Sequence, residues 1–222
     1  VHDSTSYTNY CAYFLNFLKA ARQLGYETLL LTEETGDEQL RSIIDTGMVD
    51  GVALMDVTMN DPRIELAQLS SIPLISIGHP MNEINVPCID TDFIEMGEMI
   101  MQTLCRNGHS RILFAGGKEI DYERNGGANY LIRLRTSMHD AAARYKIHID
   151  EEFTDEDDFD AAENLLERFI SSENTAIVTQ GGPLFLNNLV AATRQRNEDS
   201  SRSFADFSGN IYRFHRQASE DR

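Results

Sequence analysis

The sequence has 222 residues, of which 19 are Lys or Arg and 36 are Asp or Glu, so its formal net charge at pH 7 is −17. This acidic balance makes phosphate backbones and anionic lipid poor partners for these residues, because affinity for phosphates depends mainly on Lys and Arg. No apolar run approaches the roughly 18 residues that would span a bilayer, and no export signal is recognisable. We therefore expect no membrane association and a cytoplasmic location.

Metal and catalytic motifs are missing from the sequence. The three cysteines are widely spaced and form neither a CxxC pair nor a cluster with histidine, which argues against a disulfide framework or a zinc site. The serine-hydrolase elbow, the zinc-protease helix motif and the phosphate-binding loop are all absent. We expect no catalytic residue, no metal and no cofactor.

The predicted elements alternate along the chain. Apolar residues at helical spacing predict a first helix over residues 10–24, ending at Gly25, and a strand over residues 26–31. The same reasoning gives further helices at 36–46, 62–69, 93–106, 130–145, 159–170 and 184–194, and further strands at 51–55, 73–77, 111–115, 147–149, 175–179 and 204–207. From residue 208 onward the polar composition predicts loop.

The stretch from Asp90 to Gly117 organises this pattern. Asp92 is a candidate N-cap for the helix that follows it, and Asn107-Gly108 supplies a left-handed stop. A compact apolar strand comes next and ends in Gly116-Gly117. The unit is therefore a helix, a tight turn, a buried strand and a glycine loop.

Short strands that alternate with helices are typical of parallel βαβ units. Two such sets predict an α/β fold with two doubly wound parallel-sheet lobes, residues 1–107 and 108–222, and a hinge connection near residues 107–110. Open α/β sheets bind ligands beyond the carboxyl ends of their strands. We therefore expect a ligand cleft between the two lobes.

Two groups of charged residues are candidates for chemistry. The acidic run from Glu151 to Asp160 is most simply a solvated stretch. Arg133 and Arg135 lie two apart on a predicted helix, so only one of them can point into a cleft. A guanidinium offers a fork of donors suited to vicinal hydroxyls or a carboxylate, and a solvated surface arginine is the alternative.

Several motifs also occur in a characteristic order. They are V-D-G-V-A-L at 49–54, I-P-L-I-S-I-G at 72–78, V-P-C-I-D-T-D at 86–92, N-G-H-S-R-I-L-F-A-G-G at 107–117, R-L-R at 133–135 and T-A-I-V at 175–178. Together these segments resemble the effector-binding core of lactose-repressor-type (LacI/GalR) transcription regulators. They favour this branch over the periplasmic sugar receptors that share the fold.

The resemblance implies a homodimeric core that binds a small effector, often a sugar, between its lobes and controls operator DNA through a helix-turn-helix segment outside these residues. It gives Arg135 the role of the sugar-contacting arginine. Asp92 corresponds to an acidic residue near the ligand, although an N-cap role is an equal alternative. Asp3, Ser4 and Tyr7 are placed in a loop that lines the cleft.

The chain departs from the family at two further ligand positions. Gly181 and its neighbour Gly182 stand where the family usually has Asn-Asp, and Ser208 stands where it has an acidic residue. The lost groups normally bind sugar hydroxyls, so a different or phosphorylated ligand, or a degenerate site, is favoured over an ordinary hexose. Two other functions stay open: a solute receptor for sugar uptake, and a hydrolase that uses cleft carboxylates.

Overall fold

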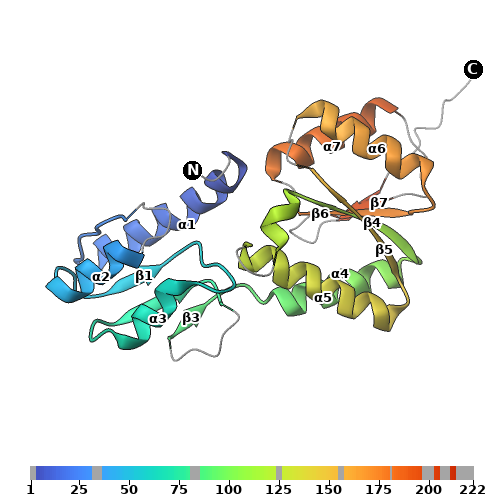
Figure 1. Ribbon diagram of the computed structural model, residues 1–222. Helices are drawn as coiled ribbons and strands as arrows, with labels where there is room; N and C mark the ends of the chain where they lie inside the picture. Colours follow the sequence, from blue (N-terminus) through green and yellow to red (C-terminus); the bar gives the residue numbers. More distant parts are fainter. Residues whose placement is uncertain are drawn as a thin grey trace, which may run out of the picture. The chain divides into compact units, whose positions relative to one another are not determined.

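The computed structural model describes residues 4–31, 37–80, 86–123, 127–154, 158–180, 182–196, 203–205 and 211–213. The chain forms two compact units, which we call unit 1 (Val1–Thr91 with Arg124–Asn129) and unit 2 (Asp92–Glu123 with Tyr130–Arg222). Each of them contains a sheet of mainly parallel strands with helices between successive strands over most of its length (Figure 1). The predicted α/β class with parallel sheets is therefore confirmed.

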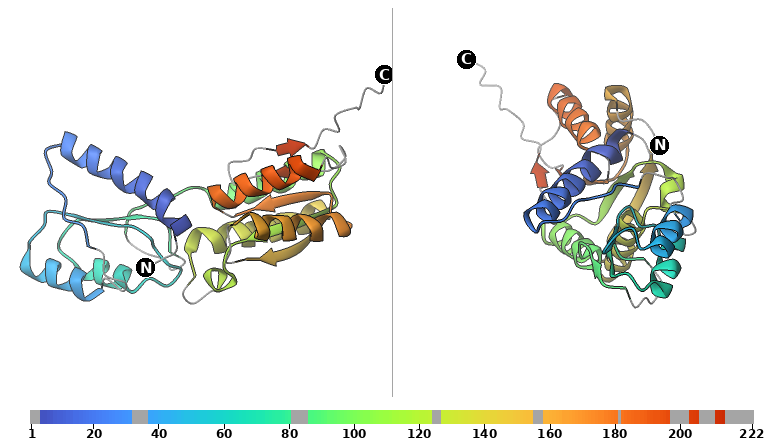
Figure 2. Two further views of the ribbon diagram at one scale, coloured as in Figure 1. Left: turned by 90° about the horizontal axis from the view of Figure 1, so that it is seen from above. Right: turned by 90° about the vertical axis from the view of Figure 1, so that its left-hand side faces the viewer.

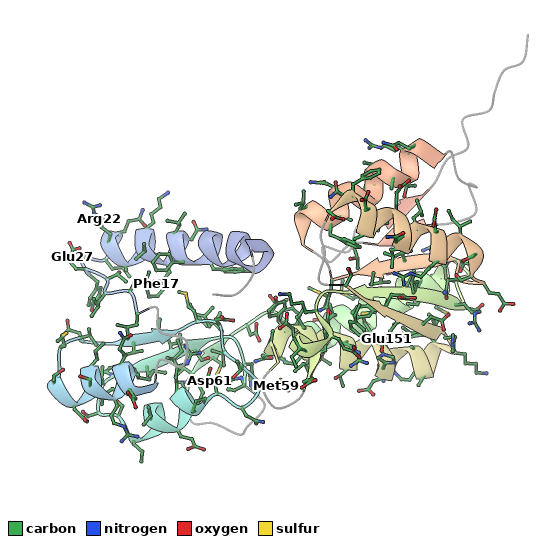
Figure 3. All side chains as sticks on the ribbon, turned by 45° about the horizontal axis from the view of Figure 1, so that its top comes forward. Phe17, Arg22, Glu27, Met59, Asp61 and Glu151 are labelled. Atoms are coloured by element: carbon green, nitrogen blue, oxygen red, sulfur yellow. The ribbon has the colours of Figure 1, made fainter. Side chains whose placement is uncertain are left out.

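Unit 1 is built on a small parallel sheet with the strand order β1-β2-β3. Its elements are α1 (Ser4–Gln23), α2 (Asp37–Thr46), β1 (Val52–Leu54), α3 (Pro62–Leu69), β2 (Leu74–Ile77) and β3 (Cys88–Ile89). A core of Leu40, Leu54, Val57 and Ile64 joins α2 and α3 to the sheet. Helix α1 lies on the other side of the sheet, and Phe17 projects from its sheet-facing side (Figure 3).

The strand predicted over residues 26–31 does not form. This segment has no regular secondary structure, and Leu29 and Leu30 are more than half exposed, at 55% and 54%. An apolar run becomes a strand only when a neighbouring strand accepts its backbone hydrogen bonds, and the described part of unit 1 pairs only β1, β2 and β3.

Unit 2 contains a larger sheet with the strand order β5-β4-β6-β7-β8, in which only β8 runs antiparallel to its neighbour. Its elements are α4 (Phe93–Arg106), β4 (Arg111–Gly116), the 3-10 helix η1 (Glu119–Tyr122), α5 (Asn129–Tyr145), β5 (His148–Phe153), α6 (Phe159–Ser171), β6 (Ala176–Thr179), α7 (Pro183–Arg196), β7 (Ser203–Ala205) and β8 (Ile211–Arg213). Helices α4 and α5 cover one face of the sheet, and α6 and α7 cover the other (Figures 1 and 2).

The core of unit 2 lies on both faces of β4 and β6. Ile112 and Phe114 are fully buried on one side of β4, and the alternate residues Leu113 and Ala115 pack with α6 and α7 on the other. This uninterrupted apolar run is what a central parallel strand requires, because helices cover both of its faces. Beyond residue 208, β8 is a strand in a segment predicted as loop.

Helix α4 has the two ends that the sequence predicts. Asp92 is its N-cap, and the carboxylate accepts hydrogen bonds from the backbone N–H groups of Ile94 and Glu95 at 3.1 and 2.9 Å. At the other end Gly108 has a φ of +82°, and the N–H of His109 donates to the carbonyl of Leu104 at 3.0 Å. The left-handed stop at Asn107-Gly108 is confirmed.

The division into units differs from the predicted boundary at 107/108. Helix α4 packs against α5 within unit 2, so the chain leaves unit 1 after Thr91. Residues 107–110 therefore connect α4 to β4 inside unit 2 and do not link the units, which makes the predicted hinge position wrong. The chain also returns to unit 1 over Arg124–Asn129, where the side-chain amide of Asn129 donates to the carbonyl of His79.

In the part of the chain that the structure describes, no helix is both long enough and apolar enough to cross a membrane.

Candidate functional site

The carboxyl edge of the unit 2 sheet gathers the polar and aromatic groups that we consider as a site. Strands β4, β5 and β6 are parallel and end at Gly116, Phe153 and Thr179. The segments that follow these strands therefore lie at one edge. In open α/β sheets this is the edge at which ligands bind.

An aromatic cluster occupies this edge. The ring of Tyr122, from η1, lies 5.1 Å from the ring of Phe153 and 6.1 Å from that of Phe114, measured between centroids. Gly116 makes the cluster possible, because a Cβ atom there would lie 2.7 Å from Phe153 Cδ1 and 3.0 Å from the Tyr122 oxygen. Gly116, the last residue of β4, thus serves aromatic packing.

Arg135 lies across this cluster and is held by Glu151. Its guanidinium carbon is 5.5 Å from the Phe153 ring centroid and 5.9 Å from that of Tyr122, within the range of a cation–π contact. Nε and Nη2 donate to the two carboxylate oxygens of Glu151 at 2.7 and 2.6 Å. The fork of donors is therefore already occupied, and Nη1 is the guanidinium nitrogen left outside the Glu151 pair.

Glu151 is ionised and paired from two sides. Burial raises the pKa of its carboxyl, but hydrogen bonds from Arg135 and from His139, at 2.8 Å, outweigh burial and lower the pKa below its usual value. The same pair raises the pKa of Arg135. Figure 3 labels Glu151 in the region between β5 and α5, the two elements that the pair ties together.

A second polar chain links β4, η1 and β6. The hydroxyl of Tyr122 donates to Oε1 of Gln180 at 2.9 Å. Burial raises the pKa of Tyr122 far above its ordinary value, so this phenol stays protonated and remains a donor. The backbone N–H of Gln180 donates to the carbonyl of Ala115 at 2.9 Å, which fixes the start of the loop after β6.

The predicted site residues divide into three groups. Arg135 is at the carboxyl edge, and Asp92 is the N-cap of α4, with one carboxylate oxygen used by that helix. Ser4 and Tyr7 lie in the first turns of α1, so their predicted placement in a loop is wrong, because the helix begins before its apolar pattern does. The remaining three, Asp3, Gly181 and Ser208, lie outside the described residues.

Sequence reasoning missed three members of this edge. Glu151 was assigned to a solvated acidic run, yet β5 continues through it to Phe153, and its side chain is only 19% exposed. Tyr122 follows the glycine loop in a polar stretch without any periodic signal. Gln180 had a weak signal, since it directly follows an apolar strand, where site residues gather in α/β folds.

Cation binding has no support at this edge. Throughout the described ranges, no group of three or more His, Cys, Asp or Glu residues is arranged to hold a metal ion. The groups that are present are hydrogen-bond donors, acceptors and aromatic faces. Groups of this kind can orient a small organic molecule.

Comparison with known families gives a match over most of the chain. The family described as "Periplasmic binding proteins and sugar binding domain of LacI family" matches residues 2–186. Among curated proteins, the HTH-type transcriptional regulator MalR of Staphylococcus xylosus is 25% identical over 122 residues, which cover 52% of this chain and 36% of that protein. The regulator CelR of Thermobifida fusca is 29% identical over 104 residues, or 45% and 31% of the two chains. The matches thus span about a third of the length of these relatives.

Solved structures show the same fold at low identity. A LacI family transcriptional regulator from Bifidobacterium animalis has a TM-score of 0.70 at 17% identity, covering 85% of this chain and 69% of that one. The Cra regulator from Pseudomonas putida, solved in complex with fructose 1-phosphate, has a TM-score of 0.58 at 14% identity and covers 84% and 68%. A Staphylococcus protein described as a "probable maltose operon transcriptional repressor" has a TM-score of 0.65 at 17% identity, covering 89% and 71%. At these identities the likeness establishes the fold alone.

Proposed function

Because the chain belongs to the family of periplasmic binding proteins and LacI-type sugar-binding domains, we propose that it is the effector-sensing core of a bacterial transcriptional regulator and not an enzyme. The observation that carries this proposal is the family match over residues 2–186, together with curated relatives that are named as HTH-type regulators. The resemblance inferred from the sequence motifs is confirmed by that match.

The proposed effector is a small sugar-like metabolite bound at the carboxyl edge of unit 2. Arg135 supports this, since it presents Nη1 beside two aromatic rings, and sugars combine polar hydroxyls with apolar ring faces. Asp92 supports it less strongly, because the N-cap accounts for one of its oxygens. No cofactor takes part in the proposed mechanism.

The proposed regulator acts on DNA through a segment other than these residues. A net charge of −17 opposes direct contact with phosphates, so operator binding belongs to a helix-turn-helix part of the longer protein. Such a protein works as a homodimer in the cytoplasm. The proposed regulator has two conformations that differ in their affinity for the operator. Effector binding shifts the balance between them to the extent that their affinities for the effector differ.

Effector binding is tested by calorimetry and thermal unfolding. Maltose and fructose 1-phosphate are the first probes, because both are named among the structural neighbours. We expect at least one sugar or sugar phosphate in a wider panel to raise the midpoint of unfolding in a concentration-dependent way. A panel in which no compound stabilises the chain contradicts the proposal.

The role of Arg135 is tested in the same titration by Arg135→Lys, which keeps the charge but removes the planar fork. We expect affinity for the stabilising compound to fall by about tenfold or more, the loss of one charge-assisted contact. The exposed Arg106→Lys, in the last turn of α4, is the matched control and should bind as the wild type does. Equal affinity in both variants removes Arg135 from the site.

The regulatory part is tested on the intact protein that carries these residues. Operator affinity is measured by fluorescence anisotropy with and without the effector, and the oligomeric state by sedimentation. A regulator shows a dimer whose operator affinity changes with effector. A monomer that binds the sugar but no DNA favours a solute receptor for uptake, the alternative that the shared fold leaves open.

A further inference from the structure

The side chain of Gln180 has an unused hydrogen-bond donor at the carboxyl edge of unit 2. Its Oε1 accepts from the hydroxyl of Tyr122 at 2.9 Å, but its Nε2 is shielded from water and has no hydrogen-bond partner among the residues that the structure describes. A buried amide N–H without an acceptor destabilises a fold by about 1–3 kcal/mol. Such a group calls for an explanation, and a ligand that supplies the acceptor is one.

Tyr122 fixes which end of the amide faces outward. Its hydroxyl donates to Oε1, the acceptor end of Gln180, at 2.9 Å. The oxygen of Gln180 is therefore held inward by Tyr122, and the nitrogen is the end left for another molecule.

Around Tyr122 and Arg135 lie three carboxylates, those of Glu119, Asp121 and Glu151, beside the donor Nη1 of Arg135. The carboxylate of Glu151 is paired with both Arg135 and His139. Residues 181 and 182, directly after Gln180, are glycines and bring no side-chain acceptor. A ligand at this edge thus meets the Gln180 amide and Nη1 of Arg135, both of which donate.

We propose that Gln180 determines effector specificity by donating a hydrogen bond from Nε2 to an acceptor oxygen of the effector, in a carbonyl, carboxylate or phosphate group. This inference rests on the proposed sensing function and narrows it. The effector class becomes sugar acids, keto sugars and sugar phosphates rather than neutral sugars recognised only through hydroxyls. Gln180 is only half-buried, so the shielded nitrogen lies close to the surface of unit 2.

The test replaces the donor without disturbing the bond to Tyr122. Gln180→Glu keeps an oxygen that accepts from the Tyr122 hydroxyl, but it puts a second acceptor where the N–H was. Gln195→Glu makes the same change at an exposed position on α7 and serves as the control. Fructose 1-phosphate, gluconate and maltose are titrated against the wild type and both variants by calorimetry.

We expect fructose 1-phosphate or gluconate to bind the wild type more tightly than maltose does. We also expect Gln180→Glu to weaken that binding by about tenfold or more, because an acceptor now faces an acceptor. Gln195→Glu should bind as the wild type does. Binding within twofold of wild type by Gln180→Glu overturns the role of Gln180 while leaving the sensing function standing.

A second measurement follows the amide itself. In ¹⁵N-labelled protein the side-chain signal of Gln180 is identified by its absence from the Gln180→Glu spectrum. Addition of the stabilising compound should shift this signal and slow its hydrogen exchange. An unchanged signal in the presence of a ligand that stabilises the protein overturns the proposal, and a panel without any ligand contradicts the sensing function and the role of Gln180 together.

Discussion

At the scale of the residue, Gly97 shows how a single missing methyl group sets the distance between two helices. It lies within α4, where glycine is less favourable than alanine by about 1 kcal/mol. A Cβ atom at this position would lie 2.5 Å from Ser137 Oγ and 2.9 Å from the backbone nitrogen of Met138. Close approach lets Ser137 donate to the carbonyl of Ile94 at 2.6 Å, so the glycine serves the contact between α4 and α5.

We expect Gly97→Ala to lower the free energy of unfolding by about 1–3 kcal/mol despite the gain in helix propensity, because the added methyl overpacks the contact. Urea denaturation followed by circular dichroism measures the change. The control is Met99→Ala on the exposed side of the same helix, which should stay within about 0.5 kcal/mol. A Gly97→Ala variant that is more stable than wild type would mean that α4 and α5 can move apart without a cost in folding free energy.

Asp61 holds the loop after β1 in unit 1. Its side chain is 2% exposed, and its Oδ1 and Oδ2 accept from Nε and Nη2 of Arg63 at 2.8 and 2.6 Å. The same guanidinium donates to the carbonyls of Met55 and Asp56 at 3.1 and 2.9 Å. Both oxygens of Asp61 and two of the three guanidinium nitrogens of Arg63 thus bind groups of unit 1 itself, which ties the loop after β1 to the start of α3.

Replacing Asp61 by Asn should destabilise unit 1 by about 2–3 kcal/mol, because one oxygen becomes an amide that faces the half-buried Arg63 cation. Glu65→Asn, exposed in the first turn of the same helix, is the comparison. Chemical denaturation of both variants gives the values. Equal losses in the two variants would show that the effect comes from the helix N-terminus and not from the ion pair.

At the scale of the element, the Glu151 pair joins β5 to α5 and makes their association pH-dependent. The pKa of Glu151 is lowered in the folded chain by Arg135 and His139. A carboxyl whose pKa is lowered by folding stabilises the folded chain fully at any pH above its pKa in the unfolded chain, which is about 4.3. This stabilisation is lost as the pH falls through the pKa of the carboxyl in the folded chain. The contribution is therefore complete at neutral pH and disappears in acid.

We expect Glu151→Gln to be less stable than wild type by about 1–3 kcal/mol at pH 7, the range for hydrogen bonds to charged groups. As pH falls through the lowered folded pKa, which lies below about 4.3, the two proteins should converge, because the wild-type carboxyl then becomes protonated. Thermal unfolding at a series of pH values measures both limits. The exposed Asp140→Asn on α5 should show no such convergence, and a constant difference for Glu151→Gln would refute the ionic origin.

Element boundaries followed from the sequence wherever a local signal marked them. The ends of α4 could be predicted because Asp92 and Gly108 act on their own backbone. The strand expected at residues 26–31 and the short strand β3 (Cys88–Ile89) could not, because a strand depends on a neighbour that may lie far away in the sequence. The full length of β5 was missed for the same reason, because its second half lies in a run of charged residues. The position of Glu151 depends on its partner on α5 and not on its neighbours in the sequence.

The candidate site was predictable only in outline. Position at the carboxyl end of a strand pointed toward Gln180, and the family resemblance pointed to Arg135. Neither could show that Glu151 occupies the arginine fork or that Tyr122 orients the amide, since both facts depend on side-chain geometry across elements. The sequence therefore indicated where the site lies, whereas the packed structure was needed to show which donor groups are left available there.

At the scale of the whole molecule, the two units differ in how well they bury their sheets. Ile112 and Phe114 on β4 are fully buried, with 0% exposure, whereas β1 has only one buried residue, Leu54. Burial of apolar area contributes about 25 cal/mol per Å² to the free energy of folding. Each strand of the larger, covered sheet of unit 2 therefore contributes more to stability than a strand of the unit 1 sheet. Within the described residues, the unit 1 sheet has three strands, close to the lower limit for an independently stable sheet.

Native-state hydrogen exchange should therefore resolve two levels of protection within one chain. Backbone amides of Ile112 to Ala115 are expected to exchange at least about 100-fold more slowly than those of Val52 to Leu54, because local opening of a thin sheet is easier than opening of a covered one. Strand β5 is the internal control: it is an edge strand of the stable unit and should follow β4 when denaturant promotes global opening. If β1 and β4 instead exchange together at every denaturant concentration, the two units unfold as a single cooperative body.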